Sequence, residues 1–182
     1  MVLISTIIIA VLILIDQLSK YLVVNSFDIG EVKNLLSIGG HEILSLTHVR
    51  NSGAAWSIMK GNKIFLIVLP LLILGFLVYL IYAKKISSKL ETLSLSLIIA
   101  GGIGNLIDRI RLSEVVDFVK TDFISFPVFN FADICVVIGT GIFCVYNIIV
   151  VPLFKKDNKV SEEVKSSDDN DNSETESNNE QI

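Results

Sequence analysis

Four long runs of apolar residues set the strongest limit on the fold of this chain. They occupy residues 2–15, 64–83, 92–107 and 134–154. The second and fourth runs have 20 and 21 uncharged residues, about the length at which a helix crosses the hydrocarbon core of a bilayer. The first run is shorter, so a spanning helix there must continue past Asp16 and Lys20. We therefore predict an all-α integral membrane protein whose four transmembrane helices lie at about residues 2–24, 64–83, 92–110 and 133–154.

Composition agrees with a membrane domain that is followed by a polar tail. Charged residues make up 19% of the chain, against about 25% in a typical soluble domain. Residues 161–182 carry eight acidic side chains and one lysine, and almost no apolar residue that could be buried. We expect residues 1–156 to form the membrane domain and residues 157–182 to be a disordered acidic tail. No basic patch with interleaved aromatic residues is present, which argues against nucleic-acid binding.

The distribution of lysines indicates how the helices are oriented. The short link between the second and third runs and the segment after the fourth run are rich in lysine, at Lys84, Lys85, Lys89, Lys155, Lys156 and Lys159. Cytoplasmic loops of membrane proteins carry an excess of such residues. The other side has more basic residues in total but spreads them over longer segments. Density therefore favours a multi-pass membrane protein with both termini in the cytoplasm.

The outer segment, residues 25–63, is too long for a hairpin and too polar for the membrane. Residues 43–49 (ILSLTHV) are rich in β-branched residues and alternate in part, which predicts a strand. Residues 51–53 (Asn-Ser-Gly) are typical of a turn. Residues 114–119 (EVVDFV) suggest a second short strand. We expect a small extracytoplasmic β-containing segment on the four helices.

Ionisable residues at membrane depth are costly and usually mark function. With both termini inside, Asp16, Asp108, Asp117 and Asp133 all fall near the outer ends of the predicted helices. Asp16 has Lys20 four residues later, which is the spacing of a helical ion pair. Asp108 has Arg109 and Arg111 beside it, and we interpret it as ion-paired with one of them.

Asp117 and Asp133 are then the two carboxylates without an obvious local cation. Two carboxylates held close together share a proton, so that one can activate water while the other polarises a carbonyl group. This is the chemistry of aspartic peptidases. Pairs that include Asp16 or Asp108 remain open, and Asn130 or Asp133 could instead cap the fourth helix. His41 and His48 are too few for a zinc site, which needs three or four ligands.

Five short blocks of the sequence carry a resemblance to a known family. They are DQLSK at 16–20, NSGAAW at 51–56, GGIGNLIDR at 101–109, VDF at 116–118 and FNFAD at 129–133. In this order the chain resembles bacterial lipoprotein signal peptidases (signal peptidase II), which are intramembrane aspartic peptidases. The resemblance covers about residues 1–155.

The resemblance implies an activity and a set of site residues. It implies removal of the signal peptide from a prolipoprotein, just before a cysteine that carries diacylglycerol, with Asp117 and Asp133 as the catalytic pair. It implies prolipoprotein substrates, contact with membrane lipid, and cyclic peptide inhibitors of the globomycin type. It implies no metal or organic cofactor. Substrate-binding or supporting roles are implied for Asp16, Lys20, Asn51, Gly53, Gly101, Asn105, Asp108, Arg109, Asn130 and Ala132.

Two readings from other functional classes fit the same polar residues. A small ion- or proton-coupled transporter also needs intramembrane Asp and Asn side chains. A non-enzymatic membrane assembly factor would use them only to hold its helices together. Cleavage of a lipidated prolipoprotein by the purified protein would separate these readings from a peptidase.

Overall fold

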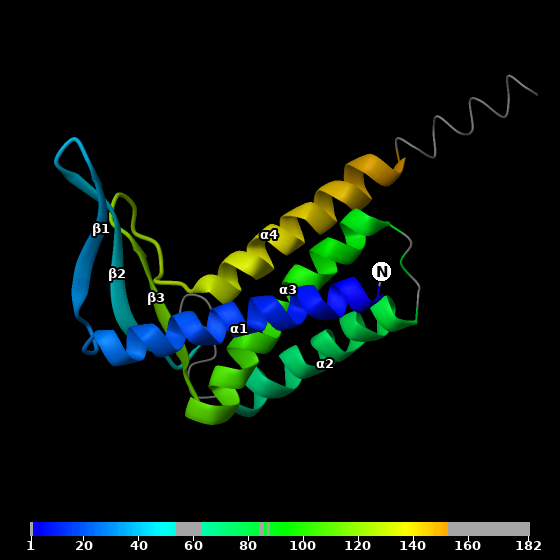
Figure 1. Cartoon of the computed structure of the whole chain (residues 1–182), viewed down its shortest axis with the longest axis horizontal. Coiled ribbons are helices and arrows are strands. Elements are labelled where there is room, and N and C mark those ends of the chain that lie inside the picture. The colour runs from blue at the N-terminus through cyan, green and yellow to red at the C-terminus, as the bar shows by residue number, and fades with distance from the viewer. Residues whose placement is uncertain (1, 54–62, 84–85, 87, 153–182) are drawn as a thin grey trace, which may run out of the picture. The chain divides into compact units, whose positions relative to one another are not determined.

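The computed structural model describes residues 2–53, 63–83, 86 and 88–152. Its helices are α1 (Val2–Ser26), α2 (Lys63–Tyr82), α3 (Lys89–Leu112) and α4 (Phe131–Val145), and a π-helix (Tyr146–Val150) follows α4 (Figure 1). Its strands are β1 (Val32–Ile38), β2 (His41–Asn51) and β3 (Val115–Thr121). The predicted tail, most of the predicted cytoplasmic lysines and residues 54–62 of the outer segment lie outside the described residues.

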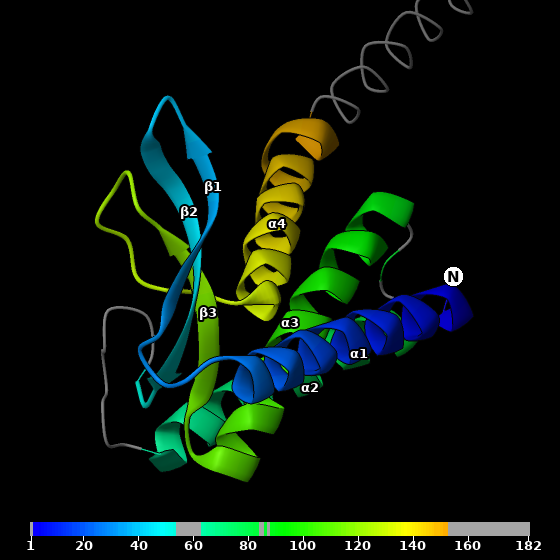
Figure 2. The same cartoon turned by 60° about the vertical axis from the view of Figure 1, so that its left-hand side comes forward.

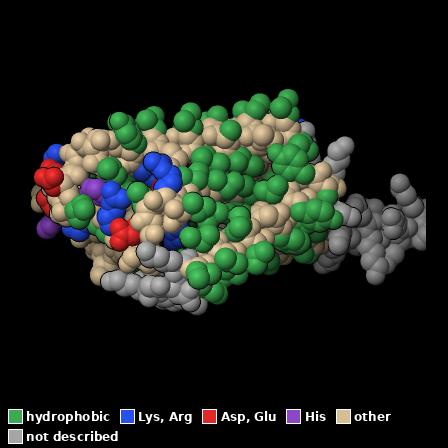
Figure 3. Space-filling model, turned by 90° about the horizontal axis from the view of Figure 1, so that it is seen from below, with side chains coloured by type: hydrophobic (Ala, Val, Ile, Leu, Met, Phe, Trp, Pro, Cys, Tyr) green, Lys and Arg blue, Asp and Glu red, His purple; other side chains and the backbone are tan. Residues whose placement is uncertain are grey.

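The predicted membrane helices are confirmed. In the described part of the chain, four helices are long and apolar enough to cross a membrane, the last one spanning Phe131–Val150. Hydrophobic side chains cover the helices on the face that Figure 3 shows, while the charged side chains gather over the end that carries the sheet. By its contacts the chain separates into two units, residues 1–143 and 144–182, and the sheet belongs to the first.

Three glycines let α3 pack closely against three different neighbours. A Cβ at Gly101 would collide with the Ala132 carbonyl oxygen of α4, and a Cβ at Gly102 would lie 2.6 Å from Leu74 of α2. A Cβ at Gly104 would collide with the Asp16 carboxylate of α1. Small residues at such positions let helix backbones approach closely in membranes. The run of glycines in the third apolar block therefore makes α3 the central helix of this unit.

The sheet is antiparallel with the strand order β1-β2-β3, and it lies at the ends of α1 and α3 (Figures 1 and 2). The strands predicted at 43–49 and 114–119 are confirmed as parts of β2 and β3. The sequence analysis missed β1. Gly39 and Gly40 connect β1 to β2 with φ of 61° and 83°, the left-handed backbone that a two-residue hairpin loop requires.

Candidate active site

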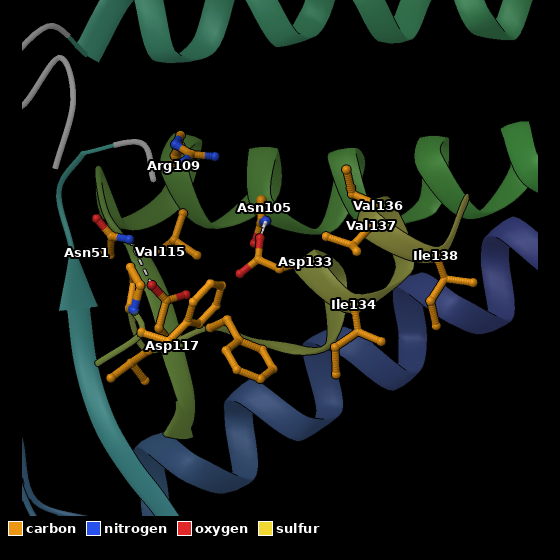
Figure 4. Close-up of a pocket in the computed structure, with 14 residues that line it drawn as sticks. Asn51, Asn105, Arg109, Val115, Asp117, Asp133, Ile134, Val136, Val137 and Ile138 are labelled. Carbon is orange, nitrogen blue, oxygen red and sulfur yellow. Dashed lines mark hydrogen bonds between the residues drawn. The ribbon is translucent and has the colours of Figure 1, made fainter. Parts of the chain in front are cut away.

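Asp117 and Asp133 line one pocket of about 430 Å³ between β3, α3 and the start of α4 (Figure 4). Their carboxyl groups face each other across the pocket (Figure 4). The other polar side chains that line the pocket are Asn51, Asn105 and Arg109. The pocket thus joins residues from β2, α3, β3 and α4 that are far apart in the sequence.

Asp117 comes from the middle of β3, where its side chain is 2% exposed. Its Oδ2 accepts a hydrogen bond from Asn51 Nδ2 at 2.8 Å, and its Oδ1 accepts one from Asn130 Nδ2 at 2.7 Å. Burial raises the pKa of Asp117 to about 6, and the charge of Asp133 adds to this increase, although the two amide donors oppose it. Asp117 can therefore hold a proton near neutral pH.

Asp133 lies in the first turn of α4, where it forms a capping box with Asn130. The Asp133 backbone N–H donates to Asn130 Oδ1 at 3.0 Å, and the Asn130 N–H donates back to Asp133 Oδ2 at 3.1 Å. The two residues that competed for a capping role in the sequence analysis therefore both cap the helix. Asp133 Oδ1 remains directed at the pocket, where it accepts a hydrogen bond from Asn105 Nδ2 at 2.7 Å.

Asn130 connects the two carboxylates. Its side chain is fully buried; its Nδ2 donates to Asp117 Oδ1, and its backbone and Oδ1 hold Asp133. A single asparagine therefore fixes how the helix start and the strand are placed relative to each other. The hydrogen-bond donors to the pair of carboxylates are neutral amide groups.

Arg109 supplies a cation at the edge of the pocket. Its side chain lines the pocket, and its Nη2 donates to the Gly53 carbonyl oxygen at 3.3 Å. The Gly53 N–H in turn donates to Asn51 Oδ1 at 3.0 Å, which confirms the predicted turn after β2. Arg109 thus holds the end of β2 against α3.

Asp16, Lys20 and Asp108 form a separate buried cluster behind the pocket. Lys20 Nζ lies 2.9 Å from Asp16 Oδ2 and 2.9 Å from Asp108 Oδ2, and all three side chains are almost fully buried. The predicted Asp16–Lys20 pair is confirmed. The predicted pairing of Asp108 with Arg109 or Arg111 is wrong, because α1 brings Lys20 to Asp108 from a distant part of the sequence.

Comparisons with known proteins identify the family. A family model described as signal peptidase (SPase) II matches residues 8–149. The lipoprotein signal peptidase of Enterococcus faecalis is 41% identical over 142 residues, which cover 78% of this chain and 84% of that one. The lipoprotein signal peptidase of Streptococcus pyogenes serotype M3 is 41% identical over 128 residues, covering 70% and 82%.

The chain belongs to the signal peptidase II family. A solved structure of a bacterial membrane enzyme also matches it with a TM-score of 0.73 and 33% identity, covering 85% of this chain and 90% of that one. A second such structure gives a TM-score of 0.71 and 32% identity, covering 80% and 92%. Family membership and the four apolar helices make this chain a multi-pass integral membrane peptidase.

The signal peptidase II resemblance singled out twelve residues, and the structure separates them by position. Those that line the pocket are Asn51, Asn105, Arg109, Asp117 and Asp133. Those that support it from outside are Asp16, Lys20, Gly53, Gly101, Asp108, Asn130 and Ala132. Ala132 is fully buried, and its N–H donates to Asp16 Oδ1 at 3.1 Å, so that the cluster on α1 holds the start of α4.

Sequence reasoning missed the apolar wall of the pocket. The wall consists of Val115, residues 126–129 and, on α4, Ile134, Val136, Val137 and Ile138. The α4 side chains lie inside a uniformly apolar run, so no pattern marks them as part of a site. The Phe126 and Phe129 rings contact each other edge to face, with their centroids 5.9 Å apart. A carboxylate pair thus lies beside an apolar surface that continues along a membrane helix.

No metal site is evident in the parts of the chain that the structure describes, where no group of three or more His, Cys, Asp or Glu side chains could hold an ion. His41 and His48 both lie in β2. His48 is buried, its Nδ1 lies 3.0 Å from the Phe27 carbonyl oxygen, and its Nε2 accepts a hydrogen bond from Arg50 Nε at 3.1 Å. These contacts give His48 a structural role where β2 meets the end of α1.

Proposed function

We propose that this protein is an aspartic endopeptidase that removes the signal peptide from diacylglyceryl-modified prolipoproteins, just before the lipidated cysteine. The observation that carries the proposal is the placement of Asp117 and Asp133 in one pocket, joined through Asn130. The names of its relatives support the substrate class. Asp117 and Asp133 are the proposed catalytic residues.

The proposed reaction needs one proton shared between the two carboxylates. The ionised carboxylate takes a proton from a water molecule, and the oxygen of that water attacks the carbonyl carbon of the scissile peptide bond. The protonated carboxylate donates a hydrogen bond to the carbonyl oxygen and stabilises the charge that develops there. When the tetrahedral intermediate collapses, the C–N bond breaks and the leaving nitrogen takes the proton that the first carboxylate accepted from water. The raised pKa of Asp117, to about 6, supports a carboxyl that is protonated in part of the molecules near neutral pH.

The remaining pocket residues suggest how a substrate is held. Asn51, Asn105 and Arg109 present polar groups beside the carboxylates and can hydrogen-bond an extended peptide backbone. The apolar wall on α4, which includes Ile134 and Ile138, can accept apolar parts of a lipidated substrate. The pocket therefore suits a peptide bond that lies between water and the bilayer.

The proposed location is the one that this substrate requires. We place both termini in the cytoplasm, and the pocket near the outer face of the cytoplasmic membrane, where water can reach it. The partners are then prolipoproteins that carry diacylglyceryl-cysteine, the surrounding lipid, and cyclic peptides of the globomycin type as inhibitors. The reaction requires no metal or organic cofactor.

Single-turnover cleavage of a diacylglyceryl prolipoprotein by the purified protein in detergent tests the proposal. Asp117→Asn and Asp133→Asn are nearly isosteric, and each should lower the rate by about 10² to 10⁴, the usual contribution of an acid–base group. Asp28→Asn is the matched control, because Asp28 is exposed and does not line the pocket. Wild-type protein that fails to cleave, or either dyad variant cleaving at the wild-type rate, would refute the mechanism.

A further inference from the structure

Lys20 makes a contact that its ion pairs do not explain. Its Nζ lies 2.9 Å from Asp16, 2.9 Å from Asp108, and donates a third hydrogen bond to Asn105 Oδ1 at 3.0 Å. An ammonium group has three donors, and these three acceptors use all of them. The Lys20 side chain is 4% exposed, so water does not compete for them. One of the three donors therefore reaches a residue that lines the pocket.

The contact with Lys20 fixes which way the Asn105 amide points. Asn105 Oδ1 also accepts a hydrogen bond from Asn130 Nδ2 at 3.1 Å, and Asn105 Nδ2 donates to Asp133 Oδ1 at 2.7 Å. If the amide were flipped, its NH₂ group would face the ammonium and another NH₂ group, and its oxygen would face a carboxylate. Both contacts would be repulsive, so a buried cation selects the orientation in which Asn105 donates to Asp133.

We propose that Lys20 is a positioning residue for peptide-bond cleavage, which acts by holding the Asn105 amide so that its NH₂ group always points at Asp133. This inference rests on the proposed function of the carboxylate pair. Lys20 does not line the pocket, and its hydrogen bonds go to Asp16, Asp108 and Asn105, so its link to Asp133 runs through Asn105. Its charge also lowers the pKa of Asp117 through space, an effect that the paired variants below share equally.

The proposal predicts a change in how the carboxylate pair responds to pH. A hydrogen bond donated to a carboxylate favours its ionised form, so losing the Asn105 donor makes the pair harder to ionise. A reaction that needs one ionised and one protonated carboxylate has a bell-shaped dependence of rate on pH, and this bell should then move to higher pH, by about one unit. The charged groups around Asp133 in the described chain are Asp16 and Lys20 on α1, Asp108 and Arg109 on α3, and Asp117 on β3.

The test compares two variants in one background, so that the charge of the buried cluster is kept. In Asp108→Asn protein, Lys20→Met and Lys20→Gln both leave the cluster of residues 16, 20 and 108 with the net charge of the wild type. The two replacements are similar in size, but only glutamine can donate a hydrogen bond to Asn105 Oδ1. The measurement is cleavage of a diacylglyceryl prolipoprotein across pH, with kcat and KM determined separately and thermal unfolding measured alongside.

We expect Lys20→Met/Asp108→Asn to lose about tenfold in kcat relative to Lys20→Gln/Asp108→Asn, with KM changed less than about threefold and with the bell moved to higher pH. The glutamine variant should keep the pH profile of the wild type, because its cluster has the same net charge and glutamine still donates to Asn105. A purely structural role for Lys20 would lower the amount of folded enzyme without moving the bell, and that result would overturn the proposal.

Two further outcomes keep the test decisive. If the methionine variant does not accumulate in the membrane, Lys20→Arg in the otherwise wild-type chain takes its place. This variant keeps a buried cation with donors and the net charge of the cluster, and it is compared with the glutamine variant. Both should then keep the unshifted profile, and a bell displaced in either one would contradict the proposal. If wild-type protein does not cleave the substrate, the proposed function fails. If it cleaves and the methionine and glutamine variants share one profile, only the role of Lys20 fails.

Discussion

The four outer aspartates differ in the donors that each one meets. Asp16 and Asp108 accept hydrogen bonds from the Lys20 ammonium, which makes both of them partners of one cation. Asp117 and Asp133 accept hydrogen bonds from asparagine amides and from backbone N–H groups. A neutral donor stabilises a carboxylate less than an ammonium does, which is why we propose the second pair, and not the first, as the pair that exchanges a proton. The same residue type thus serves two purposes according to its neighbours.

The Asn51 hydrogen bond provides a pH-dependent prediction at the residue scale. Its donor stabilises ionised Asp117, so Asn51→Ala should raise the pKa of Asp117 above about 6. The proposed mechanism needs a proton on the carboxylate pair, and a higher pKa retains that proton to higher pH. The alkaline limb of kcat/KM against pH should therefore move upward by about one unit. Asn34→Ala, a change in exposed strand β1, should leave the limb in place.

A second residue-scale prediction concerns Asp108. Asp108 Oδ2 contacts Lys20 and accepts a hydrogen bond from the Val116 N–H at 3.2 Å, and its Oδ1 accepts one from Gln17 Nε2 at 3.2 Å. Asp108→Asn keeps the shape of the side chain but removes its negative charge, which Lys20 of α1 and the Val116 N–H of β3 both contact. We expect a loss of about 1–3 kcal/mol in the free energy of unfolding, measured by thermal denaturation in detergent.

The activity of Asp108→Asn separates a structural role from a catalytic one. Asp108 does not line the pocket, so the rate per folded molecule should keep a bell-shaped dependence on pH. A rate reduced as far as in Asp133→Asn, at unchanged stability, would instead make Asp108 part of the reacting pair.

At the scale of elements, the sequence predicted the helices and strands that local pattern determines. The apolar runs predicted the four helices, and the alternating residues of β2 and β3 predicted two strands. β1 was missed because its residues are all exposed and do not alternate between a buried and a solvated face. The Gly39-Gly40 pair was the available signal, since two glycines between two strands favour a hairpin.

The site was predictable only in part, for a related reason. Asp117 and Asp133 were singled out because no cation lies near them in the sequence, and that argument is local. The partner of Asp108 was predicted wrongly because Lys20 lies on another helix, and no local pattern reports a contact between α1 and α3. The capping box of Asn130 and Asp133 shows that one side chain can both cap a helix and line a pocket.

The packing of α3 provides a prediction at the element scale. A Cβ at Gly101 would collide with the Ala132 carbonyl oxygen and lie 2.8 Å from Val136 Cγ2, and a backbone atom cannot move aside cheaply. Gly101→Ala should therefore lower the free energy of unfolding by about 1–3 kcal/mol and displace the start of α4. Because α4 carries Asp133, cleavage should fall in the folded fraction as well.

Gly141→Ala is the matched control for that change. Gly141 also lies in a membrane helix, α4, but a Cβ there meets nothing within 4 Å. Alanine favours a helix more than glycine does, so this variant should be as stable as the wild type or slightly more stable. Equal losses of stability for Gly101→Ala and Gly141→Ala would show that the close approach of α3 and α4 does not depend on a glycine at position 101.

At the scale of the whole molecule, the described fold brings the sheet and one end of several helices to one site. Asp16 of α1 holds the N–H of Ala132 in α4, Lys20 joins α1 to α3, and Asn130 joins α4 to β3. Each contact crosses between elements that are far apart in the sequence. The polar side chains that hold the helices together are thus hydrogen-bonded to those that form the pocket. Substitutions in this network should therefore change both the stability of the protein and its activity.

The acidic tail provides the prediction for the whole chain. The signal peptidase II model matches residues 8–149, so the match ends before residues 161–182 begin, and those residues carry eight acidic side chains and one lysine. A segment of this composition cannot bury enough apolar surface to pack on the membrane domain. In the orientation that we propose, with both termini in the cytoplasm, it would also lie across the membrane from the pocket. A chain that ends at Lys159 should therefore insert at the wild-type level and cleave a diacylglyceryl prolipoprotein within about twofold of the wild-type rate, since changes remote from buried features are usually small.

Membrane levels measured by immunoblot, together with single-turnover rates, check this expectation. A loss of rate of about tenfold at normal membrane levels would show that the tail acts on the reaction from the opposite side of the bilayer.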